Sequence, residues 1–413
     1  MSVDLRTRVD GPHEAITPER FFGDDLPAAL DAHADAVAGA GWLAPRPLTV
    51  EVGGEAWTLS VEDDGRVDVT AGRRDGAAHV RLTAEQVDGI AADQQTFVGM
   101  WTSGKLDQPA GRLEDAMDWW LVLRAALDGT PIHTPGAITL EDRDGRHLDV
   151  HRAFTLDDDP EDLRHFLDEA GFLHLTGVFG EDEMAAVSRE MDEAAPSYAD
   201  GDQRSWWATD NTGTRKLVRM QAFDEMSPAT AAIVADPRFQ SIGGIPGADH
   251  AWGARSDNRI EALFKPIGIV AGISDVPWHK DCSLGRHSYE CCSLTVGISV
   301  TGADDVSGQL RVRAGSHRAL VWPSFEQPRC DLPYVDLPTR TGDVTVHLSC
   351  TLHMAQPPIE RERRVMYSSF SLPAPDPEAA AAARAALREV REAAPVTVSQ
   401  PPSEHASPAA PSR

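Results

Sequence analysis

The first third of the chain combines strand-like and helical hydrophobic patterns. Four runs alternate apolar and polar side chains as half-buried strands do, with Gly-Gly and Asp-Gly turns between the first three: residues 48–52, 56–61, 66–70 and 78–82. Thr83 and Gln86 then form a capping box, which predicts the start of a helix. Two further helices are predicted by an alanine-rich stretch and an apolar stripe: Pro27–Gly41, then Ala116, Trp120, Leu123 and Leu127. These patterns predict an α+β domain over residues 1–140.

Strand patterns dominate the rest of the chain. Two amphipathic helices come first, at Pro160–Ala170 and Asp182–Ala194, and Gly171 is a suitable stop for the first. Four later runs have the two-residue period of a strand with one buried face: residues 259–265, 293–300, 344–348 and 364–370. We therefore predict a mainly-β domain with flanking helices over residues 151–375, joined to the first domain by a charged linker at 141–150.

The C-terminal end has a different composition. Residues 376–394 are rich in alanine and arginine, which favours a helix, whereas residues 395–413 are rich in proline, serine and alanine and are predicted to be disordered. Acidic residues outnumber basic ones by 65 to 38, giving a net charge of -27, which disfavours nucleic acid and anionic membranes as partners. There is no apolar run long enough for a membrane span, and the five cysteines fit free thiols in a bacterial cytoplasm.

Candidate chemistry lies in the mainly-β domain. His279 and Asp281 are two residues apart between strand-like runs, so on a strand both would face one side. A second histidine follows downstream; His353 comes after a predicted strand, and His347 within that strand is its rival. Two histidines and one carboxylate on one face of an octahedron are the ligand set of non-haem Fe(II) oxygenases.

These residues lie in segments that resemble a known family. Residues 150–373 are similar to the phytanoyl-CoA dioxygenases, which use Fe(II) and 2-oxoglutarate. The resemblance rests on an opening strand, a ligand segment, a turn and the closing strands: Glu169–Phe179, Trp278-His279-Lys280-Asp281, Gly308–Arg318 with Ala314 where proline is usual, then Gly342-Asp343, His353 and Arg363-Arg364. Lys280 replaces the usual glutamine. The family fold is a double-stranded β-helix, or jelly roll, with two facing sheets.

The resemblance implies a division of roles among the site residues. His279, Asp281 and His353 would hold Fe(II), O2 would take an open position, and Arg364 would grip the far carboxylate of 2-oxoglutarate. Alternation along residues 364–370 places Ser368 in the same cavity as Arg364. Thr295 and Lys265 are further candidates for the co-substrate pocket. The sequence assigns no role to Lys280 or to Trp206-Trp207, which fall near the expected cover of the site.

The N-terminal domain has a looser resemblance of its own. Val80–Thr83, Thr102–Leu106 and the closing helix are similar to a sterol-carrier-protein domain, which implies an apolar groove. Three tryptophans of this region have an alternative interpretation as ordinary core: Trp101, Trp119 and Trp120. With no metal-ligand set of its own, this domain is expected to present an apolar substrate and to stand apart from the iron chemistry.

The sequence thus predicts an Fe(II)- and 2-oxoglutarate-dependent dioxygenase that hydroxylates a small apolar molecule, such as a lipid, an acyl thioester or a natural-product intermediate. Succinate and CO2 would be released. Two alternatives stay open. The same chemistry could desaturate, epimerise or close a ring, or the protein could be a lipid carrier without catalysis.

Overall fold

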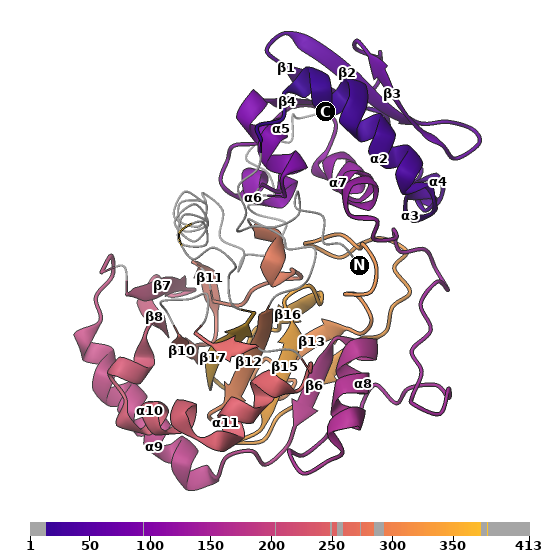
Figure 1. Cartoon of the computed structure of the whole chain (residues 1–413). Helices are drawn as coiled ribbons and strands as arrows, with labels where there is room; N and C mark the ends of the chain where they lie inside the picture. The colour runs from indigo at the N-terminus through magenta and orange to yellow at the C-terminus, as the bar shows by residue number, and fades with distance from the viewer. Residues whose placement is uncertain are drawn as a thin grey trace.

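The computed structural model describes residues 14–93, 95–202, 204–247, 250–253, 259–272, 274–284, 293–372 and 378. Figure 1 shows the elements α1–α7 and β1–β5 gathered at one end, and the remaining strands and helices at the other. We call the first group the N-terminal unit. Apart from Glu378, the predicted helix at 376–394 and the predicted tail at 395–413 lie outside the described residues.

The N-terminal unit contains a five-stranded sheet in the order β3-β2-β1-β4-β5. Strands β1, β2 and β3 form an antiparallel meander, and β4 pairs with β1 in parallel. The bounds are β1 Leu48–Val52, β2 Glu55–Val61, β3 Val67–Ala71, β4 Ala78–Leu82 and β5 Asp107–Ala110. The first four strands lie where the alternating runs predict them.

Helices pack against this sheet and close a hydrophobic core of their own. Their bounds are α1 Pro18–Arg20, η2 Phe21–Asp25, α2 Leu26–Ala32, α3 Ala34–Val37, α4 Ala40–Leu43, α5 Ala84–Ala91, α6 Phe97–Thr102 and α7 Leu113–Asp128. The capping box at Thr83 and Gln86 is formed in both directions. The continuous helix predicted over 27–41 is wrong, because His33 leaves the helical conformation and its Nδ1 bonds to the Ala126 carbonyl of α7 at 2.6 Å.

The rest of the chain folds into two facing sheets. The main sheet has the order β11-β7-β8-β10-β17-β12-β15-β6, with β9 beside β17, and the smaller sheet has the order β14-β13-β16. The strands are β6 Phe172–Leu175, β7 Ser205–Asp210, β8 Arg215–Met220, β9 Ala251–Trp252, β10 Ile260–Lys265, β11 Ile269–Ala271, β12 Ser293–Ser299, β13 Leu310–Arg313, β14 Tyr334–Leu337, β15 Val344–Leu348, β16 His353–Ala355 and β17 Arg363–Ser371. This is the predicted jelly-roll arrangement.

Helices cover the outer face of the main sheet. They are α8 Pro160–Ala170, α9 Glu181–Ala194, η3 Ala195–Ser197, η4 Phe223–Glu225, α10 Pro228–Ala235, α11 Pro237–Ser241 and η5 Ile242–Gly244; η6 Asp281–Leu284 lies elsewhere, beside α6. Phe239 of α11 packs on Phe370 of β17 at 5.0 Å between ring centroids, and Thr230 of α10 contacts Met366. Because these apolar side chains of β17 face the helices, the residues that alternate with them face the interior between the two sheets.

The region between the two groups is ordered. Residues 141–150, predicted as a charged linker, form a tight turn in which the Asp142 amide donates to the Arg146 carbonyl at 2.7 Å. Leu140 and Leu148 on either side of this turn belong to the jelly-roll core. Among the described helices, none combines the length and the apolar character needed to cross a membrane.

Candidate metal centre and co-substrate pocket

His279 and Asp281 meet His353 between the two sheets. His279 forms a single antiparallel bridge to His353, the first residue of β16, and Asp281 opens the short helix η6. The strand predicted for His279 and Asp281 is therefore wrong: the helical turn at Asp281, and not strand alternation, brings its carboxylate back toward the histidines. One ligand atom from each of these three residues lies within 4.8 Å of the others.

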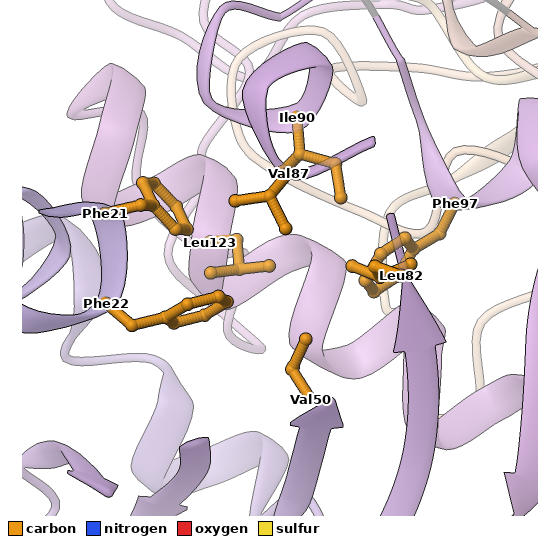
Figure 2. Close-up of a pocket in the computed structure, with 8 residues that line it drawn as sticks. All are labelled: Phe21, Phe22, Val50, Leu82, Val87, Ile90, Phe97 and Leu123. Atoms are coloured by element: carbon orange, nitrogen blue, oxygen red, sulfur yellow. The ribbon is translucent and has the colours of Figure 1, made fainter. Parts of the chain in front are cut away.

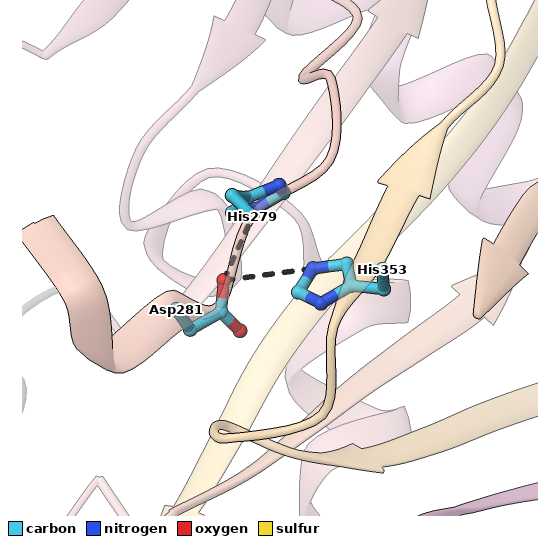
Figure 3. A group of neighbouring side chains, drawn as sticks. All are labelled: His279, Asp281 and His353. Atoms are coloured by element: carbon cyan, nitrogen blue, oxygen red, sulfur yellow. Dashed lines mark ion pairs between the residues drawn. The ribbon is translucent and has the colours of Figure 1, made fainter. Parts of the chain in front are cut away.

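The carboxylate of Asp281 faces both imidazole rings, as Figure 3 shows. Its Oδ1 is 3.4 Å from His279 Nε2 and 3.6 Å from His353 Nε2. His353 is buried, whereas about a third of the Asp281 side chain is exposed. The three donors therefore converge on one point.

Backbone carbonyls set the tautomer of both histidines. His279 Nδ1 lies 2.7 Å from the Pro277 carbonyl, and His353 Nδ1 lies 2.9 Å from the Thr351 carbonyl. A carbonyl oxygen only accepts, so each Nδ1 carries the proton and each Nε2 presents its lone pair to the centre. Metal-bound histidines are oriented in this way, and the donor set therefore fits a divalent metal ion.

Thr295 and the histidines act on the carboxylate. The Thr295 hydroxyl, on β12, donates to Asp281 Oδ2 at 2.7 Å, which leaves Oδ1 for the centre. Burial raises the pKa of Asp281, but the interactions with His353, His279 and His347 outweigh this and hold the pKa well below its usual value. Asp281 is therefore a carboxylate at neutral pH, as a ligand must be.

His347, the rival of His353, lies beside the centre. Its ring is 4.0 Å from the His353 ring between centroids, but the three-residue cluster of ligand atoms contains His353. His347 Nδ1 contacts the Leu348 carbonyl at 3.2 Å, and its buried Nε2 has no hydrogen-bond partner among the described residues. His317 has a different role, because its Nε2 bonds to the Asp168 carbonyl. Burial lowers the pKa of His317 to about 4.

The structure does not bring Arg364 or Ser368 to the centre. The guanidinium of Arg364 donates to both carboxylate oxygens of Asp192, on α9, at 2.8 and 2.9 Å. Ser368 donates to the Arg259 carbonyl on the same outer face. Both predictions were wrong by one residue of strand register. Met366 and Phe370 share a face with Arg364. Their apolar side chains were the signal that this face packs against the covering helices.

Arg363 takes the interior position instead. Its side chain is 4% exposed, and Nε and Nη2 find no hydrogen-bond partner among the described residues. It lines a small cavity of about 10 Å³ together with Gly297, Thr345 and Tyr367. A Cβ on Gly297 would lie 2.8 Å from the Thr345 hydroxyl oxygen, so glycine keeps this cavity open.

Lys265 is paired in register with Arg363 across β10 and β17. Its ammonium donates to the Ser274 carbonyl and lies 3.7 Å from Asp275. Burial lowers the pKa of Lys265 to about 7, although Asp275 opposes the shift; Arg363 and Arg219 add to it. Two buried cationic side chains thus face one carboxylate, and the interior has a local excess of positive charge that suits an anion.

Two residues to which the sequence assigned no role, Lys280 and Trp206, occupy structural positions. The ammonium of Lys280 is buried and donates to the Ser316 carbonyl at 3.0 Å, away from the centre. Trp206 lies on β7 of the main sheet. The guanidinium carbon of Arg219 is 4.2 Å from the centroid of the Trp206 ring. Arg219 in turn pairs with Glu261 at 2.8 Å.

The N-terminal unit contains a small apolar cavity, shown in Figure 2. Its volume is about 10 Å³, and its lining is entirely apolar: Phe21, Phe22, Val50, Leu82, Val87, Ile90, Phe97 and Leu123. Phe21 and Phe22 come from the π-helical turn η2, a distortion that often marks functional sites. Trp119 and Trp120 are buried in the surrounding core, as their alternative interpretation expected.

The two-sheet fold and its cluster of two histidines and one aspartate define a jelly-roll protein with the donor set of a non-haem iron enzyme. Residues 167–364 match the phytanoyl-CoA dioxygenase (PhyH) family and form a domain of that family. Proteins of this family are non-haem Fe/2-oxoglutarate-dependent oxidoreductases, and the cluster of His279, Asp281 and His353 in this domain is a candidate site for the metal. A search of curated proteins gives no match.

Solved structures give weaker likenesses. EvdMO1 is 21% identical with a TM-score of 0.42, and the match covers 52% of this chain and 50% of that one, so this chain spans half the length of EvdMO1. AviO1 from Streptomyces viridochromogenes Tue57 is 20% identical with a TM-score of 0.42, covering 54% and 99%. EctD from S. alaskensis, solved with 2-oxoglutarate and 5-hydroxyectoine, is 17% identical with a TM-score of 0.42, covering 59% and 86%.

Proposed function

We propose that His279, Asp281 and His353 are the three protein ligands of the catalytic iron. One observation carries this proposal: three ligand atoms converge within 4.8 Å, with both Nδ1 atoms bound to carbonyls and both Nε2 atoms directed to the centre. Bound Fe(II) would supply the oxygen chemistry that unreactive C–H bonds require. The residues of the chain hold the metal, and Thr295 orients the carboxylate.

Arg363, in place of Arg364, is the proposed anchor for the far carboxylate of 2-oxoglutarate. It is buried on the interior face of β17, and two of its nitrogens have no partner among the described residues. A guanidinium offers two parallel hydrogen bonds to a carboxylate. Lys265 lies at the same level of the sheet and would add positive charge to the pocket.

The proposed reaction is hydroxylation of a small apolar molecule in the cytoplasm, with release of succinate and CO2. The apolar substrate rests on the sterol-carrier resemblance and on the apolar lining of the cavity in the N-terminal unit. Desaturation, epimerisation and ring formation use the same centre and differ in what happens after hydrogen abstraction. Product analysis by mass spectrometry separates hydroxylation, a gain of one oxygen, from epimerisation, no change in mass, and from desaturation or ring formation, which both lose two hydrogens and are told apart by NMR of the product.

A lipid carrier without catalysis is the second candidate function, and the same cavity is the observation that favours it. At about 10 Å³ it is far smaller than the pockets of roughly 300–1,000 Å³ that hold drug-sized ligands, so a carrier function requires this apolar cavity to open around its ligand. A carrier would bind a fatty acid without metal and would form no succinate in the presence of Fe(II), 2-oxoglutarate and O2.

Metal titration tests the ligand assignment. Anaerobic titration of the full chain with Fe(II) is expected to show one site, and His279→Ala and Asp281→Ala are each expected to lose it together with succinate formation. His317→Ala is the matched control, because that histidine lies in the same domain but is bonded to the Asp168 carbonyl. Near-normal iron binding and succinate formation in either ligand variant would refute the assignment.

A further inference from the structure

A short segment, residues 320–325, lies directly against the candidate metal centre. The Lys280 amide donates to the Pro323 carbonyl at 2.8 Å, and the Phe325 amide donates to the Trp278 carbonyl at 2.8 Å. His279 lies between these two bonds. It forms an isolated β-bridge to Ser324 on one side and another to His353 on the other side. The backbone position of His279 is therefore set by two neighbours, and residues 320–325 are one of them.

The same segment is anchored in the N-terminal unit. The Trp322 side chain is 6% exposed and belongs to the hydrophobic core of that unit. Its indole Nε1 donates to Asp118 Oδ1, on α7, at 2.9 Å. Two backbone hydrogen bonds join Leu320 to the residues that follow α7: its amide donates to the Pro131 carbonyl at 2.8 Å, and its carbonyl accepts from the His133 amide at 2.9 Å.

A second contact of the N-terminal unit reaches the turn that carries Asp281. Helix α6 lies against η6, the turn that Asp281 opens, and Trp101 of α6 packs edge-on against Phe325 at 5.5 Å between ring centroids. Phe325 has a φ of 64°, a left-handed conformation that costs a bulky residue on the order of 1–3 kcal/mol. Such a conformation persists only where its surroundings hold it, and here the surroundings include the N-terminal unit.

We propose that the N-terminal unit is a positioning element of the metal centre: Trp322, held by Asp118, fixes the backbone that carries His279. The unit supplies none of the three ligands, but it fixes the segment against which one of them is placed. This proposal rests on the metal site of the proposed function. It differs from the expectation that residues 1–140 stand apart from the iron chemistry.

Co(II) binding to the full chain tests this, because Co(II) occupies similar sites and its visible absorption reports the ligand geometry. Trp322→Phe keeps an aromatic ring in the core and removes the N–H bond to Asp118, and Asp118→Ala removes the acceptor. Asp118→Asn keeps an acceptor and removes a charge that burial disfavours, since burial raises the pKa of Asp118 to about 6. Arg329→Ala is the matched control: it removes the cation–π contact with Trp42 between the same two parts of the protein, and a charge that acts on Asp118, but it leaves the hydrogen bond between Trp322 and Asp118 in place.

The expected result is a loss of Co(II) affinity of about three- to tenfold in Trp322→Phe and Asp118→Ala, with an altered visible spectrum. This is below the 10- to 100-fold typical of groups that bond directly to a ligand, because the effect passes through one more segment. Asp118→Asn and Arg329→Ala should bind as the wild type does. Unchanged affinity in the first two variants, or an equal loss in Arg329→Ala, overturns the proposal. A wild-type protein that binds no Co(II) instead overturns the metal site itself.

Discussion

Arg363 and Arg364 are neighbours on β17, yet their guanidinium groups lie on opposite faces of the main sheet. The side chain of Arg364 extends to α9, where the carboxylate of Asp192 accepts two hydrogen bonds from its guanidinium. Arg363 is buried between the sheets beside Lys265, and two of its nitrogens have no partner among the described residues. A buried guanidinium without a full set of partners is costly, so the interior is built to receive an anion.

Arg363→Ala is expected to weaken 2-oxoglutarate binding by roughly two to three orders of magnitude, because breaking a buried ion pair costs about 3–5 kcal/mol. Arg363→Lys should recover only part, since an ammonium lacks the two-pronged geometry. Arg364→Ala is the control, and its half-exposed pair with Asp192 contributes at most about 1 kcal/mol to stability. Calorimetric titration of 2-oxoglutarate into the metal-loaded variants decides; a defect confined to Arg364→Ala would restore the sequence assignment.

The two histidines of the closing strands should have different phenotypes. His353→Ala is expected to abolish metal binding, because it removes one of three converging donors. His347→Ala should keep the metal site and lose roughly 1–3 kcal/mol of stability, as expected for truncating a buried side chain. Fe(II) titration and thermal unfolding of both variants measure the difference. If the two results are exchanged, His347 is the ligand.

Thr295 should matter through Asp281. Thr295→Val keeps the volume of the side chain and removes the hydrogen bond to Asp281 Oδ2. We expect a loss of metal affinity of about tenfold, the lower end of the range for groups that orient a ligand. Thr295→Ser retains the hydroxyl and should restore most of the affinity. Equal affinities in the wild type and in Thr295→Val would show that the carboxylate is held by other means.

Lys265 should make 2-oxoglutarate binding depend on pH. Its pKa in the fold is about 7, so it is charged below that pH and neutral above it, with Asp275, Arg363 and Arg219 as its charged neighbours. The affinity for the dianionic co-substrate is therefore expected to fall as the pH rises through about 7. Lys265→Met should remove this dependence, which titrations of co-substrate across that pH range would measure.

Without co-substrate, the free energy of unfolding should rise as the pH rises, whereas the affinity for 2-oxoglutarate falls. The folded-state pKa of Lys265 is below the ordinary value of 10.5, so the unfolded chain binds the extra proton between about 7 and 10.5. This group therefore makes the fold more stable as the pH rises through that window, and its full penalty applies below about 7. Lys265→Met should lose this slope in denaturant unfolding; a retained slope would mean that another group titrates.

The sequence allowed four of the five strands of the N-terminal unit and the helices α8 and α9 to be predicted, together with the three residues that the structure brings together at the candidate metal centre. Periodicity of apolar residue types identified β1, β2, β3 and β4, although in the structure only β4 alternates cleanly between buried and less buried positions. His279, Asp281 and His353 were found from residue type, spacing and family resemblance together. The strand assigned to the first two was wrong, because an isolated bridge and one short helical turn leave no periodic pattern to detect.

The sequence by itself determined that Arg363 and Arg364 face opposite sides of a strand, since alternation is a property of the extended backbone. Only the tertiary structure decided which of them faces the interior, because that depends on the helices that cover Met366 and Phe370. The hydrogen bond between Trp322 and Asp118 could not be predicted from the sequence either. The two residues are 204 positions apart, and no local pattern records which buried indole meets which carboxylate when distant elements pack.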